Sequence, residues 1–286
     1  MEHTHKKLRR ARGDVIYDTI IFIILTFLFL IVAYPLYFVI ISSFSDPIEV
    51  SAGKVTVAPV GFTLDGYKEV FKTKTVVRGF LNSLIVAIGA TALTVYFSTL
   101  TAYALVAYRW KLREPFFAFI LAVMMIPGIV TSIGMYHFMY RLHLTNNLLS
   151  LILPAVYAPG AVFFFRQFML ASLPLELLDS ARIDGSKEFY TFNHIAMPIM
   201  KPAMATQGIF TFVYTWNNLF MPSILLTKDN MKTMPIMVAM LKGDIYKREY
   251  GAIYLGLSLT VLPLFVVYFT LSKYIIAGVA LGGVKG

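Results

Sequence analysis

Residues 174–202 read PLELLDSARIDGSKEFYTFNHIAMPIMKP and are the only long polar interval between hydrophobic runs that has the pattern of a helical hairpin. Pro174 suits the first turn of a helix, where its missing N–H costs nothing. Leu177, Leu178 and Ala181 then recur at helical spacing. Gly185 is the residue type preferred where a helix ends in a left-handed conformation. The stretch therefore predicts a helix, a turn at Gly185 and a second helix.

The second helix of this hairpin is predicted to begin at Ser186, because serine is a favourable N-cap. Its charged residues Lys187 and Glu188 are expected to lie away from the apolar side. That apolar side consists of Phe189, Phe192, Ala196 and Ile199.

The composition indicates that the solvent for most of the chain is a lipid bilayer. The chain has 286 residues, of which 58% are hydrophobic and 14% charged, and its mean hydropathy is +0.72. Soluble proteins carry about 25% charged residues. The net charge of +10 is spread over tails and loops beside the hydrophobic runs, where it attracts anionic membrane lipid, and we expect no nucleic-acid binding. The absence of cysteine excludes disulfides and thiolate metal sites.

Six hydrophobic runs without Asp, Glu, Lys or Arg are each long enough to approach or reach the roughly 20 residues of a membrane span. We therefore predict an all-α membrane protein with one transmembrane domain over residues 1–286. The predicted spans are 19–45, 79–108, 115–140, 144–165, 202–227 and 251–272, with the hairpin in a loop over 166–201.

Six spans place both termini on the same side of the membrane. The total Lys and Arg density is equal on the two sides, so it does not orient the chain. The basic N-terminal segment 6–12 and the short basic loop 109–113 favour a cytoplasmic location for both termini and for the hairpin, by the positive-inside rule. The first run has no small-residue cleavage site and is expected to remain as an anchor.

The sequence contains none of the motifs that would make this chain an enzyme or an ATPase. A Gly-x4-Gly-Lys-[Ser/Thr] phosphate loop, a His-Glu-x-x-His zinc motif and a Gly-x-Ser-x-Gly nucleophile turn are all absent. We expect no catalytic residue, no metal site and no cofactor bound by this chain. Ion-driven carriers usually need a carboxylate within the membrane, so the charge-free runs favour an energy source outside this chain.

The densest group of polar residues within a hydrophobic run is Trp216, Asn217 and Asn218. Amide side chains in a bilayer must find partners in protein or water. The three residues are therefore candidates for lining a substrate path, in which sugar hydroxyls bond to amides and a sugar ring stacks on indole. Packing between helices explains them equally well, and the sequence alone leaves both roles open.

The hairpin resembles the cytoplasmic EAA loop of ABC-importer permeases. That family pattern is Glu-Ala-Ala, three residues, Gly, nine residues and Ile-x-Leu-Pro. The spacing is intact here, with three mild departures at Asp179, Ser180 and Met197. The resemblance implies contact with an ATPase subunit through Asp179, Ser180, Ala181, Asp184, Gly185, Ile195, Met197 and Pro198. An ordinary surface hairpin on a membrane protein is the alternative.

Two further segments resemble carbohydrate permeases of the maltose-type importer family. The run at 216–218 resembles the Trp-Asn-[Glu/Asp/Asn]-Phe piece of their fifth span. The tail 277–286 is similar to the Ala-Gly-x3-Gly-Gly-Val-Lys-Gly ending of the smaller permease subunit, whose tail reaches the ATPase subunits. The residues implied in that contact are Gly282, Gly283, Val284, Lys285 and Gly286; a frayed glycine-rich end is the alternative.

The resemblance covers nearly the whole chain and implies one permease subunit of an ATP-driven carbohydrate importer in a bacterial-type plasma (inner) membrane. It implies a second permease subunit forming a heterodimer, two nucleotide-binding ATPase subunits that hold ATP and Mg, and an extracytoplasmic sugar-binding protein. An uncoupled channel or facilitator for small polar solutes is the alternative function, although it explains neither the hairpin spacing nor the tail.

Overall fold

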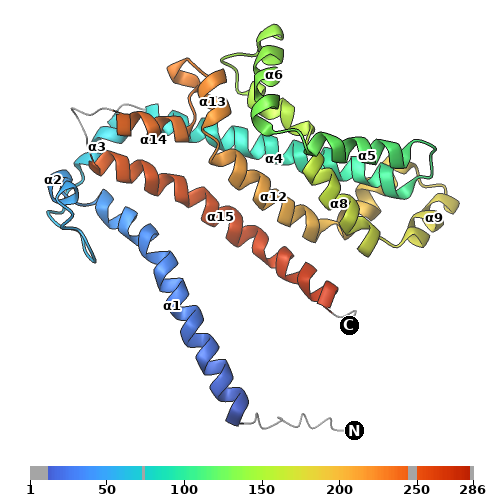
Figure 1. The fold of residues 1–286 in the computed structure, drawn as a ribbon, viewed down its shortest axis with the longest axis horizontal. Coiled ribbons are helices and arrows are strands. Elements are labelled where there is room, and N and C mark those ends of the chain that lie inside the picture. Colours follow the sequence, from blue (N-terminus) through green and yellow to red (C-terminus); the bar gives the residue numbers. More distant parts are fainter. Residues whose placement is uncertain (1–11, 73–74, 244–249, 284–286) are drawn as a thin grey trace. The chain divides into compact units, whose positions relative to one another are not determined.

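The computed structural model describes residues 12–72, 75–243 and 250–283, and all the regular secondary structure in these ranges is helical (Figure 1). The prediction of an all-α protein is confirmed. The chain forms two compact units, residues 1–68 with 249–258 and residues 69–248 with 259–286.

The first unit is built around the C-terminal end of a long apolar helix. It contains α1 (Arg12–Ser43), α2 (Pro47–Ser51), the start of α3 (Asp65–Lys72) and the first turns of α15 (Tyr250–Gly283). The Asp46 carboxylate caps α2 by accepting a bond of 2.8 Å from the backbone N–H of Ile48. Gly66 lies so close to Gly251 that a Cβ atom on Gly66 would be 2.6 Å from the Gly251 carbonyl carbon.

The second unit holds the hairpin and the remaining helices. Before the hairpin lie α4 (Thr75–Ala107), α5 (Arg113–Met124), α6 (Gly128–Arg141), α7 (Leu149–Ile152), the 3-10 turn η1 (Leu153–Val156) and α8 (Pro159–Ser172). After it lie α12 (Lys201–Trp216), α13 (Phe220–Leu225), the 3-10 turn η3 (Asp229–Met231), α14 (Met234–Gly243) and the rest of α15.

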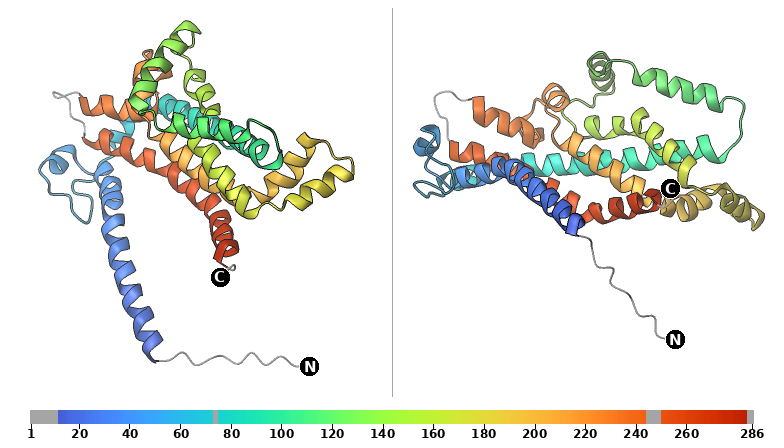
Figure 2. Two further views of the ribbon diagram at one scale, coloured as in Figure 1. Left: turned by 45° about the vertical axis from the view of Figure 1, so that its right-hand side comes forward. Right: turned by 60° about the horizontal axis from the view of Figure 1, so that its bottom comes forward.

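Helix α4 is the centre of this unit, with α8 and α12 packed along it (Figures 1 and 2). Small side chains permit this close packing, since Ala90 and Ala102 are buried on α4. At the start of α4, the Asn82 side-chain amide donates to the backbone carbonyl of Lys232 at 2.9 Å, and the Ser83 hydroxyl accepts from the N–H of Met234 at 2.8 Å. These bonds fix the segment that leads into α14.

Among the described residues, four helices are long and apolar enough to cross a membrane: Ile16–Ser43, Thr75–Ala107, Leu149–Ser172 and Tyr250–Tyr274. The predicted third run forms two helices, α5 and α6. The two helices are bent by 99° relative to each other, and the break between them ends at Pro127. The predicted fifth run forms α12 and the short α13, because helix α12 ends at Trp216. The fourth run is also interrupted, at residues 157 and 158 between η1 and α8, so three of the six predicted runs are broken.

The bounds predicted for the fourth run differ from those of the structure. Residues 144–148 form turns instead of helix, because Asn146 has φ +57° and its side-chain oxygen accepts from the N–H of Thr227 at 2.7 Å. At the other end, α8 continues past residue 165 to Ser172, with Met169 fully buried in the core. Arg166, predicted to open the loop, therefore lies within α8 and pairs with Glu114 at 3.3 Å.

Candidate functional site

The stretch 174–202 forms a hairpin of short helices. Its elements are α9 (Leu175–Ile183), a turn, α10 (Glu188–Thr191), the π-helical turn η2 (Phe192–Ala196) and α11 (Met197–Ile199). Gly185 has φ +79°, which confirms the predicted left-handed turn residue. Pro174 stands just before the first helix, at its N-cap.

Two details of the second half of the hairpin differ from prediction. Lys187, not Ser186, occupies the N-cap of α10, and the Ser186 hydroxyl instead bonds the Thr191 hydroxyl at 2.8 Å across the turn. Phe189 was predicted on the apolar face but is exposed. The buried side of this half consists of Thr191, Phe192, Ala196 and Met200, and the segment from Phe192 to Ala196 forms a π-helical turn.

The base of the hairpin is embedded in the core of the second unit. Leu178 of α9 and Phe192 of η2 are fully buried in one cluster with Ala102 of α4 and Phe165 of α8. The hairpin therefore packs directly on α4 and α8, and is not a free surface loop.

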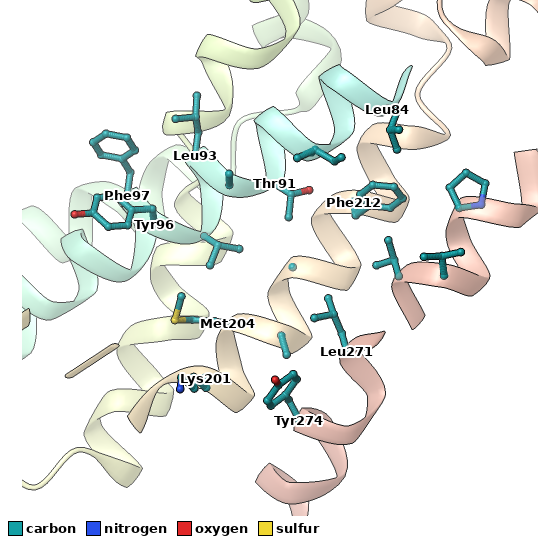
Figure 3. A pocket seen from close by; sticks show the side chains of 18 of the residues that line it. Leu84, Thr91, Leu93, Tyr96, Phe97, Lys201, Met204, Phe212, Leu271 and Tyr274 are labelled. Atoms are coloured by element: carbon teal, nitrogen blue, oxygen red, sulfur yellow. The ribbon is translucent and has the colours of Figure 1, made fainter. Parts of the chain in front are cut away.

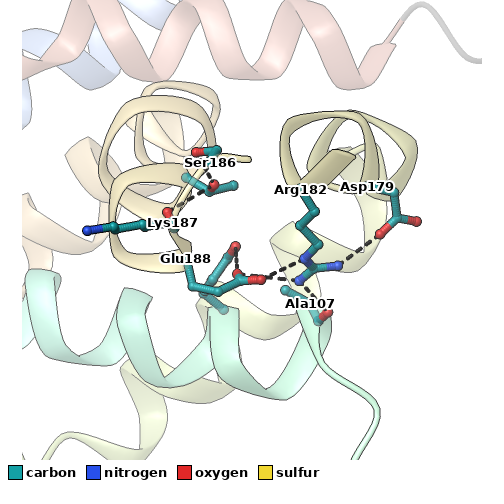
Figure 4. Close-up of polar contacts among 8 residues, drawn as sticks. Ala107, Asp179, Arg182, Ser186, Lys187 and Glu188 are labelled. Carbon is teal, nitrogen blue, oxygen red and sulfur yellow. Dashed lines mark hydrogen bonds and ion pairs between the residues drawn. The ribbon is translucent and has the colours of Figure 1, made fainter. Parts of the chain in front are cut away.

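Arg182 connects the two halves of the hairpin to the end of α4 (Figure 4). Its Nε donates to the Glu188 carboxylate at 2.7 Å, and its Nη2 donates to the backbone carbonyl of Ala107 at 3.1 Å. Its Nη1 donates to Asp179 at 2.8 Å. Glu188 also accepts a bond of 3.2 Å from the Tyr103 hydroxyl of α4. One guanidinium thus joins α9, α10 and α4.

The charges of this pair stabilise each other. The hydrogen bond from Arg182 lowers the pKa of the Glu188 carboxyl below its ordinary value of 4.5. A lowered pKa in the folded state means that the pair stabilises the hairpin above about pH 4.5. The contribution is lost as the pH falls through the lowered pKa, so the contact is fully charged at neutral pH.

The tip of the hairpin points away from this packed base and is exposed. Ile183 is 87% exposed, and Asp184 and Gly185 beside it are also exposed. Of the other residues implied in ATPase contact, Asp179, Ser180 and Pro198 are exposed, Ile195 and Met197 are partly buried, and Ala181 is buried. The candidate residues therefore form two groups. The exposed ones lie on the surface, where a partner can reach them, and the buried or partly buried ones pack inside the hairpin.

Trp216, Asn217 and Asn218 occupy three different environments. The Trp216 ring is 1% exposed between Phe80 and Phe212, and its Nε1 donates to the backbone carbonyl of Thr260 at 2.9 Å. Asn217 is exposed and its side-chain nitrogen donates to the carbonyl of Val213. Asn218 lines a cavity and accepts from the N–H of Met221 at 3.3 Å. Of the three, only Asn218 faces an open cavity.

An apolar groove of about 1110 Å³ runs between α4, α12 and α15 (Figure 3). Its walls are almost wholly carbon, with Leu84, Phe212 and Leu271 among them, and Lys201 lies at one end. Such a surface offers few groups that can bond sugar hydroxyls, so the groove does not fit a sugar path.

The implied C-terminal contact falls mostly outside the described residues. Val284, Lys285 and Gly286 lie beyond them, while Gly282 and Gly283 end helix α15. The contact between this tail and an ATPase subunit stays a prediction.

Sequence reasoning missed the role of Glu188, which it placed only as a charge away from the apolar face. It also missed the polar face of α12, where Gln207, Thr211 and Tyr214 line the same cavity as Asn218. The signal for Glu188 was its position directly after the glycine turn, within reach of Arg182. For α12 the signal was the spacing of polar residues at one helix face.

The all-helical fold with a broken-helix core and an embedded hairpin is that of an ABC-importer permease. In a crystal structure of a bacterial ABC transporter that imports the acidic polysaccharide alginate, one chain has a similar fold, with a TM-score of 0.78 and 21% sequence identity. The match covers 94% of this chain and 99% of that chain.

Residues 94–280 match the family described as binding-protein-dependent transport system inner membrane component, and the chain belongs to that family. The arabinooligosaccharides transport system permease protein AraQ of Halalkalibacterium halodurans is 36% identical over 263 residues, which are 91% of this chain and 94% of AraQ. The lactose transport system permease protein LacG of Rhizobium radiobacter is 31% identical over 97% of this chain and 98% of LacG. The chain is thus a multi-pass inner-membrane transport subunit and not an enzyme.

The first prediction concerns the glycine turn. Gly185→Val should abolish transport while membrane insertion stays normal, because a β-branched residue is strained at φ +79°. No atom lies within 4 Å of the place that a Cβ would occupy at this residue, so the defect is one of backbone conformation and not of space. Gly185→Asn is the matched control, since asparagine tolerates the left-handed region, and it should retain most uptake. Normal uptake by the valine variant would show that the turn conformation is dispensable.

The second prediction concerns the ion pair. On the coupling role proposed for the hairpin below, Glu188→Gln should lower the amount of solute taken up per ATP hydrolysed by several-fold, because the hairpin loses its charged bond to Arg182. The loss in stability should be only about 1 kcal/mol, since both side chains remain partly exposed.

The control is Asp65→Asn, which removes an exposed ion pair with Lys68 in α3 and should leave the coupling ratio unchanged. Both ratios are measured in proteoliposomes that contain the assembled complex. An equal ratio for Glu188→Gln and the unsubstituted protein would contradict the role given to this pair.

Proposed function

We propose that this chain is one permease subunit of an ATP-driven ABC importer for a carbohydrate, driven by ATPase subunits through the hairpin at 174–202. The relatives named for arabinooligosaccharide and lactose transport support a carbohydrate substrate. A neutral sugar is further supported by the absence of ionised residues from the apolar runs.

The observation that carries the coupling proposal is the contrast between the two ends of the hairpin. Its base is buried against α4 and α8, whereas its tip exposes Ile183, Phe189 and Tyr190. Large apolar side chains gathered at an exposed tip are typical of a surface that binds another protein. The ATPase subunit is the partner that fits, because the spacing of this stretch resembles the EAA loop.

The proposed mechanism is mechanical. ATP and Mg bind to the partner ATPase subunits, and closure of those subunits pushes the hairpin tip held in their surface. Helix α12 begins two residues after α11, and Arg182 ties the hairpin to the end of α4. A push on the tip would therefore move α4 and α12 together, and the spans would alternate between inward-open and outward-open arrangements.

The remaining partners follow from the same proposal. A second permease subunit completes a heterodimeric path, and an extracytoplasmic sugar-binding protein delivers the substrate to it. The hairpin and both termini lie in the cytoplasm, with the polar loop at 46–78 on the opposite side. The C-terminal residues 282–286 add a second contact with the ATPase subunits.

The experiment is sugar uptake by the reconstituted complex of this chain with its second permease, ATPase and binding protein. Lactose and an arabinooligosaccharide are the probes, and uptake of one of them should require both ATP and the binding protein. Uptake that proceeds equally without ATP would identify an uncoupled channel instead.

A variant of the hairpin tip tests the ATPase contact separately. Ile183→Asp should reduce co-purification of the ATPase subunit about tenfold or more, because a charge enters an apolar contact worth at least about 1.4 kcal/mol. Ile48→Asp is the matched control, as Ile48 is 74% exposed in α2. If both variants retain the ATPase subunit equally, the tip is not the contact.

A further inference from the structure

A cavity of about 720 Å³ lies between α4, α6, α8 and α12. Helix α12 presents Gln207, Thr211 and Tyr214 to this cavity, and Asn218, in the break that follows the helix, lines it as well. The spacing of four and three residues places Gln207, Thr211 and Tyr214 on one face of α12, and Asn218 follows four residues later, just beyond the end of the helix. This cavity therefore differs in chemistry from the apolar groove on the other side of α12.

The opposite face of α12 is packed. Gly208, Phe212 and Trp216 are buried there, and Phe212 and Trp216 cluster with Ala87 of α4. The helix thus has one apolar side for packing and one polar side. Within a bilayer, polar side chains must face protein or water and not lipid.

Three interruptions of helical structure meet at the same cavity. They are the start of α6 at Gly128, the junction of η1 and α8 at residues 157–159, and the break before α13 at Asn218. Helix breaks leave backbone N–H and carbonyl groups without helical partners. At membrane depth such backbone is tolerated where it is buried in protein or lines a water-filled cavity. Because these three breaks line the cavity, their backbone agrees with a wet site.

The groups around the cavity suit a neutral polyhydroxylated molecule. The hydroxyls of Thr131 and Ser132 both donate to the Gly128 carbonyl at 2.8 Å, which leaves their oxygens free to accept. Tyr214 is 74% exposed and offers both a hydroxyl and an aromatic face. No Asp, Glu, Lys, Arg or His is among the described residues that line the cavity. A phosphate or carboxylate would find no counter-charge there.

We propose that the polar face of α12, formed by Gln207, Thr211 and Tyr214, together with Asn218 just beyond the helix, is the wall of the translocation path that contacts the sugar. The inference rests on the proposed function and deepens it by assigning substrate contacts to this chain. Of the three residues that the sequence offered as candidates for the substrate path, Trp216 to Asn218, only Asn218 keeps that role, and Trp216 packs between helices.

Thiol labelling tests whether this face is wet, because the chain has no native cysteine. Thr211→Cys should react with a charged methanethiosulfonate reagent in the assembled complex. Thr206→Cys is the matched control on the same helix, since Thr206 is also partly buried but lines neither the cavity nor the groove. Equal labelling of the two variants, or none at Thr211→Cys, would overturn the wet path.

Transport tests the sugar contact itself. With lactose or the arabinooligosaccharide, whichever the unsubstituted complex takes up, Thr211→Val should lower the uptake rate about three- to tenfold, as expected for one lost hydrogen bond. ATP hydrolysis stimulated by the loaded binding protein should stay unchanged, whereas a merely structural defect would lower it as well. Thr206→Val should retain both activities.

The outcomes separate this inference from the proposed function. If the unsubstituted complex imports one of the sugars and Thr211→Val imports it equally fast, the α12 contact is wrong and the importer stands. If the unsubstituted complex imports neither sugar, the proposed carbohydrate function fails for these substrates, and labelling at Thr211→Cys still reports whether the face is wet.

Discussion

The Arg182 guanidinium is the contact on which the arrangement of the hairpin depends. It bonds Glu188 across the glycine turn, Asp179 on its own helix and the Ala107 carbonyl at the end of α4. Below it, Leu178 and Phe192 are buried with residues of α4 and α8. Polar and apolar contacts thus hold the hairpin base in one orientation while the tip stays exposed. A lever that passes force from a partner to membrane helices needs this combination, and the proposed coupling follows from it.

The bilayer imposes the second constraint, because polar groups within it must be satisfied by protein or water. Most of the chain meets this constraint with apolar helices, of which Ile16–Ser43 is the clearest example. One region combines several exceptions, because the breaks at Gly128 and Asn218 border the same cavity as the polar face of α12. Trp216 meets the constraint differently, with its indole N–H bonded to Thr260 inside the packed side. The polar exceptions therefore mark the proposed path, and the tryptophan does not.

The sequence predicted the features that depend on local chemistry. Gly185 was assigned its left-handed turn because only residue type and spacing were needed, and the all-helical membrane fold followed from charge-free runs. Features that depend on tertiary contacts were missed. Ser186 looks like an N-cap, but its hydroxyl bonds Thr191, and Glu188 looks like a solvated charge until Arg182 is brought beside it. Hydropathy also cannot separate a continuous span from a broken one. Pro127-Gly128 marks the break in the third run in the sequence, and the structure has it there, whereas no proline or glycine marks the break after Trp216, which was not predicted.

The central claim is that the hairpin and α4 move as one body when the ATPase subunits close. Spin labels at Lys187→Cys, an exposed hairpin residue outside the proposed ATPase contact, and Thr101→Cys would measure the distance from the hairpin to α4 by electron paramagnetic resonance, with a second label pair on the two ATPase subunits to report their closure. Trapping ATP should shorten the distance between the ATPase labels and leave the hairpin-to-α4 distance unchanged. A hairpin-to-α4 distance that changes in step with ATPase closure would contradict this claim.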